Sequence, residues 1–223
     1  MARPKIYDIS PLMSPRSGVF PGDVAFQRNV SMEISKGHNI GLSSLTTTVH
    51  IGAHADAPIH YVQGGQGIDQ RDLHRYLGRC LVIRAKAPAA SRIEKKHLEG
   101  AWATRSAKDW PAERILVHTG SFPDPDRWNS DFNSFSPELI EEWARAGVKT
   151  IGLDTPSIDP EDSKELPSHK MVAQYDLAVL EGLVLTDVPS GLYTLIALPL
   201  KIENADASPV RAILVADEGG AFA

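Results

Sequence analysis

Four side chains that can bind a metal or transfer a proton lie within one short segment, TTTVHIGAHADAPIH. They are His50, His54, Asp56 and His60, and all four positions are even-numbered. Side chains of an extended chain alternate with a period of two, so these four would project toward one side of a strand that runs into a loop. Burying them together without a metal would leave polar groups unpaired. The segment therefore predicts a metal site.

A helix is the alternative geometry for this segment, because His50 and His54 have the i, i+4 spacing of zinc-protease helices. The neighbouring residues oppose a helix: Val49 and three threonines favour a strand, and Pro58 would break a helix. We expect extended backbone here. Gly52 would let the chain approach a metal closely, and Pro58 would stiffen the exit from the site.

The donor set suits a divalent transition metal, which binds imidazole nitrogens and carboxylate oxygens at about 2.0–2.2 Å and keeps a position for water in catalytic sites. Asp56 could bridge two ions through its two oxygens. His60, four residues further on, could act as a general acid/base instead of a ligand. The pattern indicates a metal-dependent hydrolase. It leaves open a mononuclear iron oxygenase, whose facial triad also has two histidines and one carboxylate, and a metal-binding protein without catalysis.

The remaining four histidines, His38, His74, His97 and His118, have no comparable acidic or imidazole neighbours in the sequence. We therefore assign no chemistry to them. His97, beside Lys95 and Lys96, is expected to be solvated.

Short β-branched runs recur along the chain and predict the sheet that positions the histidine segment. The expected strands are Leu45–Ile51, Cys80–Ala85, Ile115–His118, Val148–Leu153, Leu180–Leu185, Tyr193–Leu198 and Val210–Ala216.

Helices are fewer. The clearest is Pro137–Ala146, with Ser136 as N-cap and Gly147 as C-terminal cap. Two more are expected, at Ser91–Trp102 and near Pro167–Asp176. Because strands outnumber helices and do not alternate with them, a doubly wound sheet is disfavoured. We predict an α/β fold, a single domain over 1–223 that is rich in mixed sheet with a few flanking helices, and a loose tail at 217–223.

Composition limits the class of partner. A net charge of −5 without a basic cluster argues against nucleic acid, and no run approaches the roughly 20 apolar residues of a membrane span. The N-terminus lacks the apolar stretch of a secretory signal. Cys80 is the single cysteine and lies in an apolar run, so we expect it in the core. We expect a cytoplasmic protein that acts on a small molecule.

The segment HIGAHADAPIH resembles the H-x-G-T-H-x-D-x-P-x-H signature of the cyclase-like metal hydrolases, and within that family the chain is similar to the bacterial kynurenine formamidases (arylformamidases). The likeness extends to YDISPLMSP and FPGD near the start, GLDTPSIDPEDSKELPSH in the middle, and LEGLVL and LIALPLKIENADASPVRAIL toward the end. It implies the swivelling β/β/α fold of that family and a homodimer or larger homo-oligomer.

The resemblance also implies a site for two metal ions, usually zinc, with manganese possible. His50 and His54 match ligands of one ion, and Asp56 matches the carboxylate that bridges both. The other ligands of the family, a histidine and a glutamate twelve residues apart, fall on His169 and Glu181. Neither of these two stands out by itself, although Glu181 is unusual among the apolar residues of AVLEGLVL.

The activity that the resemblance implies is hydrolysis of a linear amide, N-formyl-L-kynurenine, to L-kynurenine and formate in tryptophan degradation. His60 matches the catalytic histidine. Phe20 stands where formamidases typically carry a tryptophan that holds the substrate, and Ala53 replaces the threonine of the signature. Phe keeps an apolar face but lacks the indole N–H. The nearest alternative is a related hydrolase of a cyclic amide such as isatin.

Overall fold

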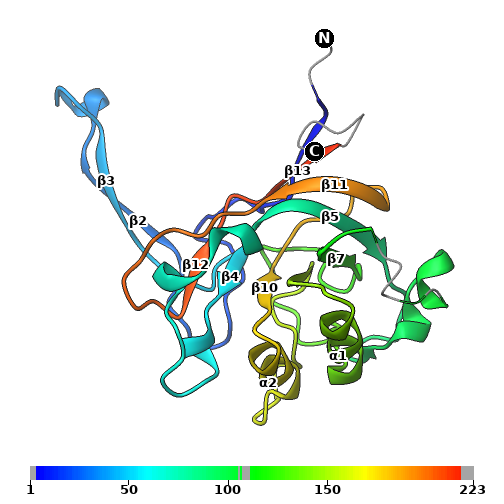
Figure 1. Cartoon of the computed structure of the whole chain (residues 1–223). Helices are drawn as coiled ribbons and strands as arrows, with labels where there is room; N and C mark the ends of the chain where they lie inside the picture. The colour runs from blue at the N-terminus through cyan, green and yellow to red at the C-terminus, as the bar shows by residue number, and fades with distance from the viewer. Residues whose placement is uncertain (1–3, 105, 107–110, 217–223) are drawn as a thin grey trace.

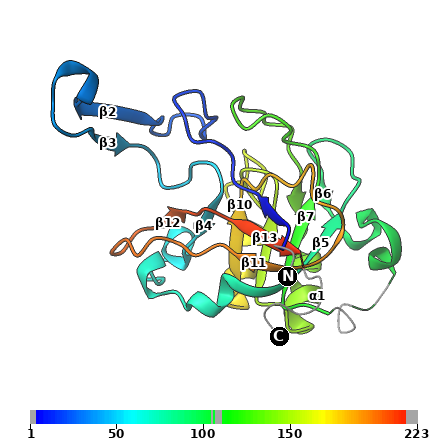
Figure 2. The same cartoon turned by 90° about the horizontal axis from the view of Figure 1, so that it is seen from above.

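A nine-stranded mixed sheet forms the frame of the protein (Figures 1 and 2). The computed structural model describes residues 4–104, 106 and 111–216. In spatial order the strands are β1 (Ile6–Asp8), β13 (Ile213–Ala216), β11 (Gly191–Ile196), β5 (Leu77–Arg84), β7 (Arg114–His118), β9 (Thr150–Leu153), β10 (Ala178–Glu181), β4 (His54–Asp56) and β12 (Ala207–Pro209).

The middle of the sheet is parallel and both flanks are antiparallel. Strands β5, β7, β9 and β10 run parallel, whereas β11, β13 and β1 on one side and β4 and β12 on the other pair antiparallel. Helices α1 (Pro137–Arg145) and α2 (Pro167–Gln174) lie on one face of the parallel strands (Figure 1). Within the described ranges, no helix is long and apolar enough to cross a membrane. The predicted mixed-sheet α/β fold is confirmed.

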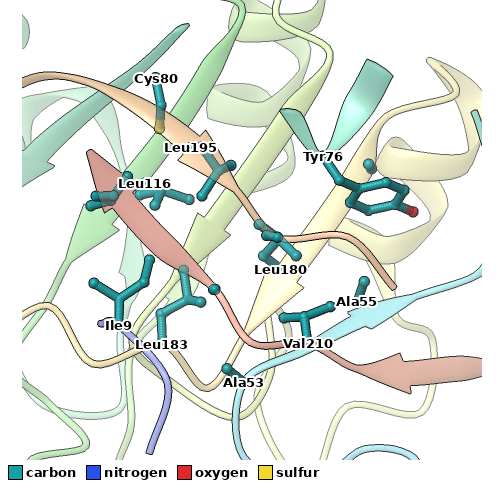
Figure 3. Packing of buried hydrophobic residues seen from close by; sticks show 14 of the residues in the cluster. Ile9, Ala53, Ala55, Tyr76, Cys80, Leu116, Leu180, Leu183, Leu195 and Val210 are labelled. Atoms are coloured by element: carbon teal, nitrogen blue, oxygen red, sulfur yellow. The ribbon is translucent and has the colours of Figure 1, made fainter. Parts of the chain in front are cut away.

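Both faces of the parallel strands are covered, which explains the apolar runs within them, such as CLVI in β5, ILV in β7 and AVL in β10. In β7, Ile115 packs on the helix side with Trp143, whereas Leu116 points to the opposite core. That second core also holds Cys80 and Leu180, which come from different strands (Figure 3). Cys80 is fully buried, as predicted.

Helix α1 forms where its capping residues predict it. The Ser136 hydroxyl accepts a hydrogen bond from the Leu139 N–H at 3.2 Å, Pro137 occupies the first helical position, and Gly147 has a φ of +95° after the last turn. Leu139 and Trp143 bury one face of the helix against the sheet. The expected helix at Pro167–Asp176 is likewise present as α2.

The predicted helix at Ser91–Trp102 is wrong. Strand β6 (Arg92–Ile93) pairs with β8 (Ser134–Phe135), and two short 3₁₀ turns follow at Lys95–His97 and Gly100–Ala103. Ring nitrogen Nδ1 of His97 accepts a hydrogen bond from the Glu94 N–H, so a local turn replaces the first helical turn. Pairing with β8 therefore outweighs the local capping signal.

The predicted strand Leu45–Ile51 is also wrong beyond its first residues. Strand β3 (Leu42–Thr46) ends at Thr46, the chain is irregular from 47 to 53, and a new strand begins at His54. Gly52 interrupts the extended backbone with a φ of +57°. The strand expected at Leu180–Leu185 lies earlier, in β10, and the other expected strands agree to within a few residues. The expected tail at 217–223 is outside the described residues.

Strands β2 (Gln27–Met32) and β3 form a hairpin of their own that extends away from the main sheet (Figures 1 and 2). Every residue of β3 is exposed, and so are all of β2 except Met32. Leu42 and Leu45 expose 52% and 59% of their surface. An isolated two-stranded hairpin is only marginally stable in water and needs apolar cover on one face. The described part of the chain does not cover this one.

Candidate metal centre

Antiparallel pairing of β4 with β10 brings three of the candidate ligands together. His54 and Asp56 lie two residues apart on β4 and point the same way, and Glu181 pairs directly opposite His54. Each of the three is about 2% exposed. The prediction that an extended chain aligns the even-numbered residues is thus correct for His54 and Asp56.

His50 and His60 reach the same place from irregular segments. His50 lies before β4, and His60 ends a 3₁₀ turn that begins at Pro58. The ring of His50 is 5.1 Å from the ring of His54 and 4.3 Å from the ring of His60, between centroids. The four predicted residues therefore converge, although one strand does not carry them all.

His169 completes the cluster from the first turn of α2. Its Nε2 lies 3.5 Å from Oδ2 of Asp56 and 3.6 Å from Oε1 of Glu181. Its Nδ1 lies 2.8 Å from Oδ2 of Asp159, which also accepts hydrogen bonds from the backbone. Arg92 pairs with the other oxygen of Asp159. Such an outer carboxylate fixes the ring orientation of a ligand histidine.

The backbone orients His54 in the same manner. Its Nδ1 donates to the carbonyl of Gly52 at 2.9 Å, so the lone pair of Nε2 faces Asp56 and Glu181, each 3.4 Å away. The chain leaving β10 crosses this turn at Gly182, where φ is +65° and a Cβ would lie 2.2 Å from the Gly52 carbonyl oxygen. Only glycine allows this crossing.

Three buried atoms of the cluster have no hydrogen-bond partner among the described residues: Nε2 of His54 and both carboxylate oxygens of Asp56. Leaving such atoms unpaired is costly. Two ligands that are each about 2.1 Å from one ion at a tetrahedral angle lie about 3.4 Å apart. The separations of 3.4–3.6 Å that join His54 and His169 to Asp56 and Glu181 match that value. The residues present therefore fit a metal.

The carboxylates create a field that favours positive charge. Burial by itself lowers the pKa of His50, but the Asp56 carboxylate, whose Oδ1 lies 3.0 Å from Nδ1 of His50, raises that pKa to about 9. Burial likewise opposes the protonated form of His169, yet Asp159, Asp56 and Glu181 hold its pKa well above the ordinary value. A divalent ion would satisfy this field in place of the protons.

Asp206 is a site residue that the sequence reasoning missed. Its Oδ2 lies 3.0 Å from Nε2 of His50 and 3.7 Å from Nδ1 of His60. Its position follows from topology, because β12 starts at the next residue and pairs with β4. Burial lowers the pKa of His60, which favours the neutral ring that a general base requires. His50, Asp56 and His60 are also close enough to share an ion.

A cavity of about 670 Å³ opens onto the cluster. His54, His169 and Glu181 line it together with Phe20 and Trp128, whose rings meet edge to face at 5.4 Å. This volume suits a small aromatic molecule. Phe20 therefore lies where the resemblance predicts a wall of the pocket.

Comparison with known proteins agrees with this geometry. Residues 7–160 match the model of the family described as putative cyclase, and the chain belongs to that family. It is 45% identical to the kynurenine formamidase of Bordetella petrii over 210 residues, 94% of this chain and 97% of that protein. It is 44% identical to the kynurenine formamidase of Delftia acidovorans over 212 residues, with the same coverage of 94% and 97%.

Solved structures agree as well. A potential metal-dependent hydrolase with cyclase activity superposes with a TM-score of 0.78 at 25% identity, covering 96% of this chain and 99% of that one. An isatin hydrolase bound to thioisatinate gives a TM-score of 0.75 at 19% identity, with 95% and 92% covered, which shows the shared fold alone. The resemblance drawn from HIGAHADAPIH is confirmed, and the relatives and neighbours support a metal-dependent amidohydrolase.

The mononuclear iron oxygenase loses its support in this structure. A facial triad would leave His169 and Glu181 without a role beside the metal. Instead, Nε2 of His169 lies 3.5 Å from Asp56, and the carboxylate of Glu181 lies 3.4 Å from Nε2 of His54 and 3.6 Å from Nε2 of His169. The cluster has too many inward donors for a three-ligand site.

Proposed function

We propose that the protein is a kynurenine formamidase, which hydrolyses N-formyl-L-kynurenine to L-kynurenine and formate in tryptophan degradation. The likeness of 43–45% over 94% of the chain to proteins of that name carries this proposal. The buried donor cluster beside an aromatic cavity supports it, because amide hydrolysis needs an activated water next to a held substrate.

We propose that His50, His54 and Asp56 hold one ion and that Asp56, His169 and Glu181 hold the other, with zinc as the metal and manganese as the alternative. The unpartnered oxygens of Asp56, each facing a different histidine, support a bridging role. When bound, the ions lower the pKa of water and polarise a carbonyl.

We propose that His60 moves the protons of the reaction. Its ring adjoins that of His50, its side chain is 35% exposed toward the cavity it lines, and Asp206 lies 3.7 Å from its Nδ1. In this proposal His60 first accepts a proton from the attacking water. It then delivers a proton to the arylamine nitrogen as the C–N bond breaks. Phe20 and Trp128 would hold the aryl ring and exclude water from that side.

The test is a kinetic assay of the purified protein with N-formylkynurenine, which follows the absorbance of kynurenine. Turnover is expected, with loss on chelation and recovery on repletion with zinc or manganese. A fully metallated protein that leaves N-formylkynurenine intact would contradict the proposal. Hydrolysis of isatin under the same conditions would assign the site to cyclic amides instead.

We also propose a homodimer, or a larger assembly of identical chains, in the cytoplasm. The exposed Leu42 and Leu45 of the β2–β3 hairpin support self-association. Covering such apolar surface with a second chain lowers the free energy of the system. The cytoplasmic location rests on the single, buried Cys80, which needs no oxidising compartment.

A further inference from the structure

A second histidine lines the cavity from another strand. His118 is the last residue of β7, Asp154 directly follows β9, and Glu181 ends β10. These three positions share the carboxyl edge of the parallel strands, where ligands of α/β sheets bind. All three line the same cavity, together with His60. His118, to which the sequence assigns no chemistry, therefore has acidic and imidazole neighbours that come from other segments of the chain.

Arg84 sets the tautomer of His118. The two residues are partners in the parallel register of β5 and β7, and Nη1 of Arg84 lies 2.7 Å from Nδ1 of His118. A guanidinium can only donate, so Nδ1 accepts and the proton of the neutral ring lies on Nε2. Nη2 of Arg84 donates to the carbonyl of Thr186, which fixes the arginine. Burial lowers the pKa of His118, in keeping with a neutral ring.

The Nε2–H of His118 lacks a strong acceptor on Asp154, although that carboxylate is its neighbour. Oδ2 of Asp154 is 3.5 Å away, and the two oxygens already accept from the backbone of Thr119 and Gly120 and from the Thr119 hydroxyl at 2.8–3.1 Å. Gly120 leaves the ring edge open, since a Cβ there would lie 3.8–3.9 Å from Cε1 and Nε2.

His118 lies too far from the metal donors to act on the same atoms. Strand β7 is separated from β10 by β9, so two strand spacings of about 4.8 Å place it roughly 10 Å from the strand of Glu181. A substrate whose amide sits at the cluster would reach His118 only with a distant part of the molecule. In N-formylkynurenine that part is the amino-acid side chain, which carries ketone and carboxylate oxygens.

We propose that His118, held by Arg84, donates the hydrogen bond of its Nε2–H to an acceptor oxygen on the side chain of the substrate and so selects acyl-aniline substrates that carry such a chain. This inference rests on the proposed formamidase activity. A polar group that loses its hydrogen-bond partner in a closed pocket discriminates strongly between otherwise similar substrates.

The experiment compares kcat/KM for N-formylkynurenine with kcat/KM for formanilide, which has the same scissile bond and no side chain. His118→Leu should lower the ratio of the two by about tenfold or more. His118→Gln, which restores an N–H at similar reach, should recover most of it. His74→Leu, at an exposed position outside the cavity, is the matched control and should leave the ratio unchanged.

If formanilide is hydrolysed too slowly to give a reliable kcat/KM, inhibition by L-kynurenine provides a second measurement. Its inhibition constant should rise about tenfold or more in His118→Leu. Metal content of each variant is measured to confirm an intact centre. The role of His118 would be overturned if the ratio and the inhibition were both unchanged, or if kcat/KM fell equally for both substrates. Neither result would contradict the formamidase activity itself. A wild-type protein that does not turn over N-formylkynurenine would instead remove the proposed function.

Discussion

The buried cluster at β4 and β10 and the exposed hairpin of β2 and β3 depart from ordinary protein surfaces in opposite ways. In the cluster, Asp56 and Glu181 are carboxylates about 2% exposed, with histidines at ion-pair distance. In the hairpin, Leu42 and Leu45 expose more than half of their surface to solvent. Charge without enough partners and apolar surface without cover both raise the free energy of an isolated chain. The first calls for a cation, and the second for another apolar surface.

The largest effect is expected from Asp56→Asn, which keeps the shape of the side chain but removes the charge between the histidines. We expect the bound metal to fall to a small fraction of the wild-type content and amide hydrolysis to fall to background. Metal analysis measures the bound metal, and the kynurenine assay measures the hydrolysis. Asp8→Asn, at a partly exposed ion pair on β1, is the matched control. Normal metal loading in Asp56→Asn would remove the bridging role.

His60→Ala should separate proton transfer from metal binding. If His60 is the general acid/base, kcat falls by roughly 10²–10⁴-fold while the metal content is kept. The ring nitrogens of His60 are also close enough to share an ion with His50 and Asp56. Loss of metal to the level of Asp56→Asn would therefore reassign His60 as a ligand.

Removing the metal should lower the thermal stability of the sheet that holds the cluster. A ligand at 100 times its Kd stabilises the folded state by about 2.7 kcal/mol. For a chain of this size each kcal/mol shifts Tm by about 2–4 °C, so chelation should lower Tm by roughly 5–10 °C. Asp56→Asn provides the control, since chelator should hardly move its Tm. An equal shift in both proteins would show that the chelator acts elsewhere.

The smallest effect on the chain itself is expected in the hairpin. The double change Leu42→Ser and Leu45→Ser removes apolar surface that the rest of the chain does not cover, so the stability of a single chain should change by no more than about 0.5 kcal/mol per site. Association of the variant chains with one another should weaken. Light scattering over a concentration series measures this change. An assembly unchanged in mass and dissociation constant would show that the hairpin is not the contact between copies.

Several features could be predicted from the sequence because their causes are local. The spacing of His50, His54, Asp56 and His60 within eleven residues brings them together whether the backbone is a strand or a loop. Helix α1 begins and ends at its own capping residues. The same local reasoning failed for Ser91–Trp102, because pairing of β6 with the distant strand β8 decides that segment.

The rest was decided by contacts between residues far apart in the chain. Glu181 reaches His54 only through the antiparallel register of β10 with β4, and Asp206 reaches His50 only because β12 lies beside β4. The pairing of Arg84 with His118 depends in the same way on the register of β5 with β7. By itself the sequence determined which donors are present and which of them are neighbours along the backbone. Tertiary structure alone decided which atoms face one another, because strand order and register follow from burying both faces of the sheet and leave no trace in local spacing.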